Sequence, residues 1–159
     1  MASRRETLLQ NVVTRLDAIR TGAAYHNMGK LKSVQRYVHE WNRDEHDTNL
    51  FRDGETILVS VDNETTEADV VDEFANVITL DLWWAKIGGE WNCSDINAAL
   101  EDMKRALFVG KDVGFGVNAT EPRMQNSKEN PRTGAPIDGL HLFLTLTYKE
   151  ELGSPEIGD

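Results

Sequence analysis

The feature that most constrains the fold of this chain is a strict alternation of side chains over residues 76–87. Its large apolar residues all fall on one side, which is typical of a β-strand with one buried face. Those residues are Ile78, Leu80, Leu82 and Trp84. Gly88 and Gly89 then interrupt the pattern, because glycine readily adopts the backbone conformations that end a strand. We therefore expect a half-buried strand that ends in a tight turn.

A helix is expected directly after this turn. Ser94 is predicted as its N-cap, and Asp95 would lie where the positive end of the helix dipole favours an acidic side chain. The apolar residues that follow recur at helical spacing and form a stripe of Ile96, Ala99, Leu100, Met103, Ala106 and Leu107. Gly110 is predicted to close the helix. We expect the stripe to pack on the apolar face of the strand over residues 76–87.

A second amphipathic helix is predicted over residues 3–20. Ser3 and Glu6 have the spacing of a capping box, and Gly22 stands where a left-handed C-terminal cap is expected. The apolar stripe of this helix consists of Leu8, Leu9, Val12, Val13, Leu16 and Ile19. One face of the helix must therefore be buried.

Three further segments, residues 33–41, 55–62 and 140–148, show strand patterns. The last is the clearest, because its leucines occupy every second position and fix which face is buried. Residues 42–54 are expected to form a solvated loop, and residues 63–72 are expected to allow a short helical turn. The sequence therefore predicts an α+β two-layer sandwich, with about four mainly antiparallel strands and two helices on one face.

The length of 159 residues suits a single domain with one core, which we assign to residues 1–150. Within it, residues 111–137 are rich in Gly, Pro, Asn and Gln. They predict a long arm, since ordinary connections between elements are much shorter. A short strand over residues 113–120 at the base of the arm fits the pattern. Residues 151–159 are predicted to be a flexible acidic tail.

The chain carries 27 acidic and 17 basic residues, which gives a formal net charge of −10. An acidic surface repels phosphate groups, so sequence-independent binding of nucleic acid is not expected. Cys93 is the single cysteine, which excludes an internal disulfide. No apolar run approaches the ~20 residues that span a bilayer, and no apolar signal core follows the N-terminus. We therefore expect a soluble, unsecreted protein with no membrane partner.

The sequence offers no convincing reaction centre. Its histidines lack metal-ligand spacing with Cys, Asp or Glu, and the crowded residues 44–47 are typical of a solvated acidic loop. The Gly-x-Ser-x-Gly, P-loop and His-Glu-x-x-His motifs are missing. We predict no enzymatic activity, no catalytic, metal-binding or cofactor-binding residue, and no cofactor. The alternative, an enzyme of unknown type, predicts a pocket that collects Asp44, His46 and Cys93.

The opposite face of the predicted sheet is half apolar, which suggests a contact with another protein. Trp83 and Trp91 fit two interpretations equally well, as interface anchors or as a small satellite core. The arm adds basic residues that suit an interface. The candidate interface residues are Tyr37, Trp41, Trp83, Trp91, Phe143, Arg123, Lys128 and Arg132.

The order of these elements resembles the tail terminator, or tail completion, proteins of long-tailed bacteriophages. The resemblance is carried by the first helix, which ends in Leu16-Asp17-Ala18-Ile19, and by the aromatic pair in Leu82-Trp83-Trp84. It also rests on residues 102–107 of the second helix and on the alternating leucines of residues 140–148.

This resemblance implies a structural virion protein with no catalytic residues. Such a subunit forms a homohexameric ring that caps the head-proximal end of the tail tube, ends tube polymerisation and joins the tail to the head connector. The implied partners are further copies of the chain, the tail tube protein and the head-tail connector protein, with the tail sheath as an open case. The implied location is the neck region of the virion tail, and the host cytoplasm during assembly.

Other phage connector, neck or baseplate proteins are the alternative within the same class, because a shared fold alone does not fix a function. A closed ring would cover the open edges of such a sheet, which are otherwise aggregation hazards. The negative charge would suit a lumen through which genome DNA passes without specific binding, because an acidic channel repels phosphate.

Overall fold

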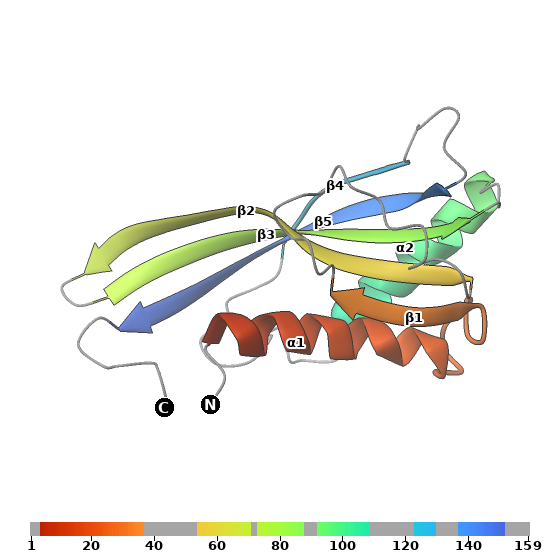
Figure 1. Ribbon diagram of the computed structural model, residues 1–159, viewed down its shortest axis with the longest axis horizontal. Helices are drawn as coiled ribbons and strands as arrows, with labels where there is room; N and C mark the ends of the chain where they lie inside the picture. The colour runs from red at the N-terminus through yellow and green to blue at the C-terminus, as the bar shows by residue number, and fades with distance from the viewer. Residues whose placement is uncertain are drawn as a thin grey trace.

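The computed structural model describes residues 4–36, 54–70, 73–87, 92–108, 123–129 and 137–151. Figure 1 shows the arrangement of the elements. In chain order they are α1 (Arg4–Asp17), the short 3-10 helix η1 (Ala18–Arg20), β1 (Leu31–Arg36), β2 (Glu55–Val70), β3 (Glu73–Ile87), α2 (Cys93–Leu107), β4 (Arg123–Glu129) and β5 (Ile137–Glu151). Within these ranges, no helix is long and apolar enough to cross a membrane.

The strands form one sheet in the order β1-β2-β3-β5-β4. β1 pairs with β2 in parallel, and the other three pairings are antiparallel. The predicted α+β sandwich with a mainly antiparallel sheet is therefore confirmed. The sheet has five strands, one more than predicted. The additional strand is β4, which lies within the long arm predicted over residues 111–137.

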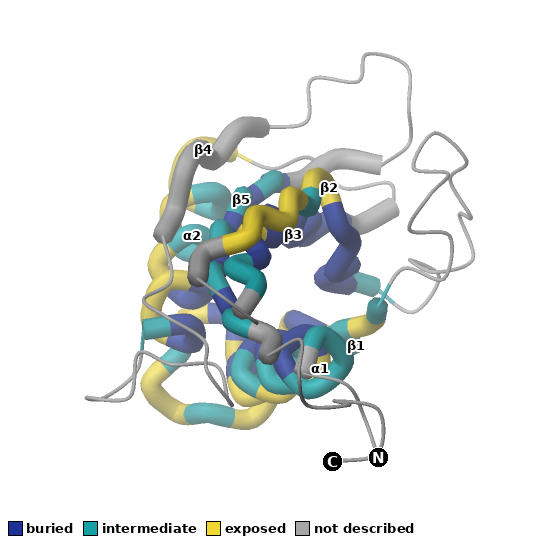
Figure 2. Tube along the Cα trace, turned by 90° about the vertical axis from the view of Figure 1, so that its left-hand side faces the viewer, coloured by how far each residue is buried: buried dark blue, intermediate teal, exposed yellow. Residues whose placement is uncertain are grey.

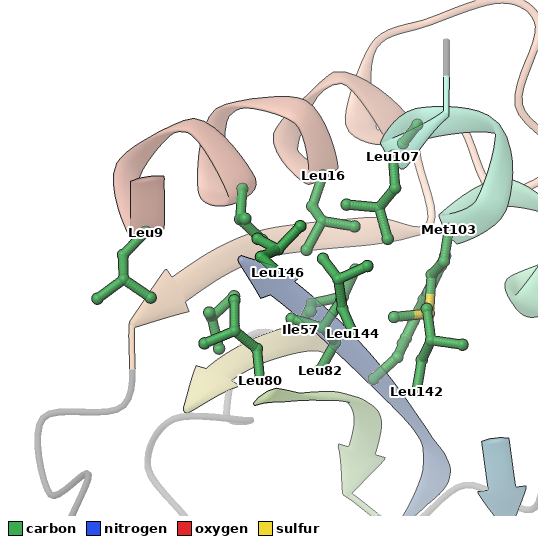
Figure 3. Close-up of a cluster of buried hydrophobic side chains, with 14 of the residues drawn as sticks. Leu9, Leu16, Ile57, Leu80, Leu82, Met103, Leu107, Leu142, Leu144 and Leu146 are labelled. Carbon is green, nitrogen blue, oxygen red and sulfur yellow. The ribbon is translucent and has the colours of Figure 1, made fainter. Parts of the chain in front are cut away.

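The main core lies between one face of the sheet and both helices, as predicted. Figure 3 shows Leu9 and Leu16 of α1 and Met103 and Leu107 of α2 directed toward the leucines of the strands. On the sheet side the buried residues alternate along each strand, as in Leu140, Leu142, Leu144 and Leu146 of β5. The predicted core faces of the strands at residues 55–62, 76–87 and 140–148 are thus confirmed.

Helix α2 begins earlier than predicted, with Asn92 as its N-cap in place of Ser94. The Asp95 N–H donates to Asn92 Oδ1 at 2.8 Å, and the Asn92 N–H donates to Asp95 Oδ2 at 3.1 Å. Asn92 has an acidic residue three positions later, so it forms a reciprocal capping box that satisfies two backbone donors. Phe108 is the C-cap, while the predicted closing residue Gly110 lies outside the described residues.

Gly22 does not form the predicted left-handed cap; Thr21 ends η1 instead. Glycine is needed at position 22 for space, because a Cβ there would lie 2.6 Å from the Tyr25 ring and 2.9 Å from the Ala18 carbonyl oxygen. A left-handed backbone occurs instead at Gly29, with φ of 80°. The other half of the first helix prediction, the cap at Ser3, lies outside the described residues.

Two strand boundaries also differ from the prediction. β2 continues to Val70, so residues 63–70 are extended and do not form the expected helical turn. Antiparallel pairing with β3, as far as Val70 opposite Glu73, holds this half of β2 in the sheet. β1 begins at Leu31, and the later part of its predicted range, residues 37–41, lies outside the described residues together with the loop at 42–53, residues 113–120 and residues 152–159.

Beyond the part covered by helices, β2, β3 and β5 continue, and among the described strands they form a three-stranded extension. The pairing of β1 ends at Arg36 opposite Val59, and the pairing of β4 reaches only Thr145 on β5. Figure 1 shows the three strands running past the N-terminal end of α1. Near the base, Glu64 of β2 accepts hydrogen bonds from Arg5 Nε at 3.1 Å and from the Tyr148 hydroxyl at 2.9 Å, which attaches the extension to α1.

Candidate interaction surface on the second sheet face

The second sheet face is the side of the strands turned away from both helices. Cross-strand pairing places its residues in rows: Leu58, Trp83 and His141 form one row, and Ser60, Asp81 and Phe143 form the next. A third row contains Asn63, Thr79 and Thr145. Residues directly opposite each other in an antiparallel pair lie on the same face and interact through their side chains. The face is therefore a mixed aromatic and polar surface at the centre of the sheet.

A buried acid and a histidine form the most distinctive pair on this face. Asp81 Oδ1 lies 2.8 Å from His141 Nδ1, within hydrogen-bonding distance. The Asp81 side chain is 3% exposed and that of His141 is 16% exposed. A buried carboxylate needs such a partner, because an unpaired charge away from water is strongly unfavourable. The pair therefore accounts for a buried acidic residue on this face.

Two aromatic rings flank the imidazole of His141. Trp83 stacks on it with the ring centroids 5.1 Å apart and the planes 11° apart. Phe143 lies on the same strand, with its centroid 6.4 Å from the imidazole and the planes 15° apart. Stacking of this kind fixes the orientation of the imidazole and holds Nδ1 toward Asp81. The four residues therefore act as one packed unit.

An acid-histidine pair is also the orienting half of a hydrolytic triad, which needs a nucleophile on the imidazole. The hydroxyl groups of the adjacent rows serve other partners. Ser60 Oγ donates to the backbone carbonyl of Asp81 at 3.5 Å, and Thr79 shares a hydrogen bond of 3.1 Å with Thr145. Among the described residues, these hydroxyl groups therefore do not supply a nucleophile to the imidazole.

The structure describes half of the candidate interface residues. Trp83 and Phe143 lie on the second sheet face as the alternation predicted, and Phe143 is half-buried. Trp83 is only 8% exposed, so the atoms of its own chain cover it. Of the two interpretations of Trp83, this burial favours the satellite core. The other described candidates are Arg123 and Lys128, while Tyr37, Trp41, Trp91 and Arg132 lie outside the described residues.

Strand β4 brings the two basic candidates beside this unit. Lys128 is paired with His141, and Arg123 is paired with Thr145. Both positions therefore continue these rows of cross-strand pairs at the β4 edge of the sheet. The sequence placed these residues in an arm and offered no relation between them and the aromatic residues; the sheet register supplies it.

Two buried acidic residues, Asp81 and Asp102, were not among the residues predicted to form a site. Asp81 left no local signal, because its partner is 60 positions away and only the β3–β5 register brings the two together. Asp102 did leave one: it interrupts the apolar stripe of α2 between Ala99 and Met103, and it is fully buried. A carboxylate on a buried helix face predicts a specific set of donors.

The other chemical groups of the described residues do not converge. In the ranges that the structure describes, no group of three or more His, Cys, Asp or Glu residues is arranged to hold a metal ion. Cys93 is exposed, whereas Asp44 and His46, its partners in the enzyme alternative, lie outside the described residues. Comparison of the sequence with protein families and with curated proteins finds no significant match.

The burial of Trp83 leads to a testable prediction. Trp83→Ala is expected to lower the free energy of unfolding by about 3 kcal/mol, because it removes a large buried ring and its stacking on His141. Trp83→Phe keeps an aromatic ring and should lose less. Urea denaturation followed by circular dichroism measures both. Unchanged stability of Trp83→Ala, together with weaker self-association, would instead identify Trp83 as an interface anchor.

Proposed function

We propose that this chain is a structural virion protein of a long-tailed bacteriophage. In this proposal, copies of the chain form a homohexameric ring on the head-proximal end of the tail tube. The ring ends tube polymerisation and joins the tail to the head connector. No catalytic step is involved, and the genome passes through the lumen without specific binding.

The observation that carries the proposal is the unequal cover of the sheet. Both helices lie on one face, while the strands at the two ends of the sheet, β1 and β4, each have a single neighbour among the described strands. Among the described strands, the extension of β2, β3 and β5 adds further edges without a neighbour. Open strand edges are hazards in an isolated subunit, and a closed ring of copies covers them.

The net charge and the second sheet face also support the proposed function. A net charge of −10 suits a protein that surrounds passing DNA, because it disfavours contacts with phosphate. The second sheet face presents Phe143, Thr145 and Thr147, which are half-buried and uncharged. Surfaces of this mixed character are typical of protein-protein contacts.

The test is addition of the purified chain to growing tail tubes assembled from the tube protein. We expect native mass spectrometry to show a six-subunit species, and electron microscopy to show tubes that stop growing and carry the chain at one end. Because a ring that closes only on a tube would leave the free chain monomeric, the tube-end result decides. Binding to a purified head connector or baseplate, with no effect on tubes, would favour the alternative class.

A further inference from the structure

We propose that neighbouring copies of this chain join through opposite edges of their sheets: the acidic edge of one copy, residues 62–70 of β2, pairs with the basic edge of the next, β4. This inference rests on the proposed ring and names the surfaces that build it. It assigns one occupant to each open edge, a second copy of the same chain.

The acidic edge is the side of residues 62–70 that faces away from β3. The pairing of β1 with β2 ends at Val59, so among the described strands residues 62–70 have only β3 beside them. Asp62, Thr66 and Glu67 are exposed, and Figure 2 shows this run of β2 in the exposed colour. The segment contains four acidic residues and no basic residue: Asp62, Glu64, Glu67 and Asp69.

The basic edge lies at the opposite end of the sheet. β4 follows β5 as the last strand, and it is seven residues long. It carries Arg123 and Lys128 against a single acid, Glu129. In a chain whose net charge is −10, a strand with a positive balance is the complement that the acidic edge requires.

The strand directions permit a regular ladder across the contact. β2 and β5 are each antiparallel to β3 and so run in the same direction, whereas β4 is antiparallel to β5. A copy placed edge to edge without inversion therefore sets its β2 antiparallel to β4 of its neighbour. Antiparallel pairing is the more stable arrangement per residue.

The register also requires a stagger between copies. Through β5 and β3, Arg123 lies level with Asn63 of β2, and Glu129 lies level with Ile57. The centre of β4 thus lies level with about residue 60 of β2, whereas the centre of the acidic edge is about residue 66 of β2. The offset of about six residues corresponds to roughly 20 Å along the strand. A sheet closes into a barrel only when its strands are staggered in this way.

A contact between two acidic edges is disfavoured, because it would place like charges opposite each other. The other basic element at a sheet edge is the start of β1, where Lys30 and Lys32 are exposed. β1 lies at the same end of the sheet as the acidic edge, so pairing between those two would give a two-fold dimer and would not propagate into a ring. The proposed ring therefore requires β4 as the partner of the acidic edge.

Charge reversal tests the proposal with variants of the full chain. The first variant, Asp62→Lys with Glu67→Lys and Asp69→Lys, makes both edges basic; the second, Arg123→Glu with Lys128→Glu, makes both edges acidic. Each variant alone is expected to self-associate at least about tenfold more weakly than the natural chain in sedimentation velocity, since opposed like charges cost several kcal/mol. A mixture of the two restores both kinds of contact in an alternating ring, so association should return only when they are combined.

Lys30→Glu with Lys32→Glu is the matched control, because it changes the net charge as much as the second variant does. We expect it to associate like the natural chain, and circular dichroism should show all three variants folded. Normal association of either edge variant alone, or no recovery in the mixture, would overturn the proposal. Loss of association in the control with none in the second variant would assign β1 as the partner of the acidic edge and also overturn it.

The tube-capping experiment separates this inference from the proposed function. The same variants are also added to growing tail tubes. The edge pairing is then tested even if the chain assembles only on tube ends. If the edge variants cap tubes as the natural chain does, the edge pairing is contradicted and the proposed function is not. Self-association that follows the charge pattern, without capping, would contradict the proposed function and leave the edge pairing in place. A natural chain that neither associates nor binds tubes contradicts both.

Discussion

Replacing Leu144 with Asp is expected to abolish the folded subunit. Leu144 is fully buried and belongs to the cluster that joins both helices to the sheet. Leu80 lies directly opposite it on β3, and Figure 3 shows both side chains inside this cluster. A carboxylate at this point would be buried without a partner, at a cost of several kcal/mol plus the lost apolar contacts. That total approaches the whole stability of a typical domain, about 5–15 kcal/mol.

Two variants make this result interpretable. Leu144→Ala removes the apolar contacts without adding a charge, and it is expected to stay folded with a loss of about 2–5 kcal/mol. Val77→Asp places the same new charge on an exposed position of the neighbouring strand, where Val77 is 37% exposed, and should melt close to the natural chain. Thermal unfolding followed by circular dichroism compares all three. A cooperative transition of Leu144→Asp at normal temperature would show that β5 is placed in the wrong register.

The position of Leu144 in the core follows from sequence because it depends only on local alternation. A period of two decides which face of a strand is buried, and the large apolar residues of residues 140–148 leave no ambiguity. The same reasoning placed the core face of β3 and the stripe of α2. With three strands and two helices each offering one apolar face, a two-layer sandwich is the arrangement that buries them all.

The two parts of the sheet that the sequence did not predict depend on distant partners. β4 has the sequence Arg-Met-Gln-Asn-Ser-Lys-Glu, which lacks alternation and contains several residues that are depleted in strands. It is a strand because β5 pairs with it. Residues 63–70 of β2 are likewise held by β3 in a long hairpin. Propensity is a weak guide wherever tertiary pairing supplies the hydrogen bonds.

The candidate surface was predicted in part for the same reason. The alternation correctly placed Trp83 and Phe143 on one face, but it gave no measure of how far that face is covered, so the burial of Trp83 was left open. The contact between Asp81 and His141 depends on the register of β3 against β5, and the relation of Lys128 to that pair depends on β4. Registers between strands are long-range properties that a single sequence does not display.

The second large effect is expected from Asp102, which attaches the turn before β1 to helix α2. Its carboxylate accepts hydrogen bonds from the backbone N–H groups of His26 and Asn27, at 2.9 and 2.8 Å. It also accepts one from Asn27 Nδ2 at 2.8 Å. Asp102 is fully buried and Asn27 is 8% exposed. One carboxylate therefore satisfies three donors of a connection that places β1 at the edge of the sheet.

Asp102→Ala is expected to lower the free energy of unfolding by about 3–5 kcal/mol, because the three donors would be left in or near the interior without an acceptor. Asp102→Asn keeps one acceptor oxygen and should lose less. Urea denaturation near neutral pH measures the differences. Hydrogen exchange at Leu31, whose backbone N–H donates to the Asn27 carbonyl at 3.2 Å, should accelerate more than exchange in β3.

Glu101 provides the matched control for Asp102. It is the adjacent acidic residue, and it contacts His26 Nε2 at 3.2 Å and Arg105 at 3.1 Å, but it is exposed. The hydrogen bond and charge of His26, with a smaller contribution from Arg105, hold the pKa of Glu101 below its ordinary value. The stability from this contact is present above the ordinary pKa of a glutamate and is lost as the pH falls through the lowered one.

Solvent screens the contacts of Glu101, so Glu101→Ala should change stability only slightly at neutral pH. Comparing the two alanine variants therefore separates burial from charge. If Asp102→Ala were no more destabilising than Glu101→Ala, the buried hydrogen bonds of Asp102 would not be what holds the turn, and the position of β1 would have to depend on its pairing with β2 alone. A large loss confined to Asp102 shows that helix α2 sets the sheet edge through one side chain.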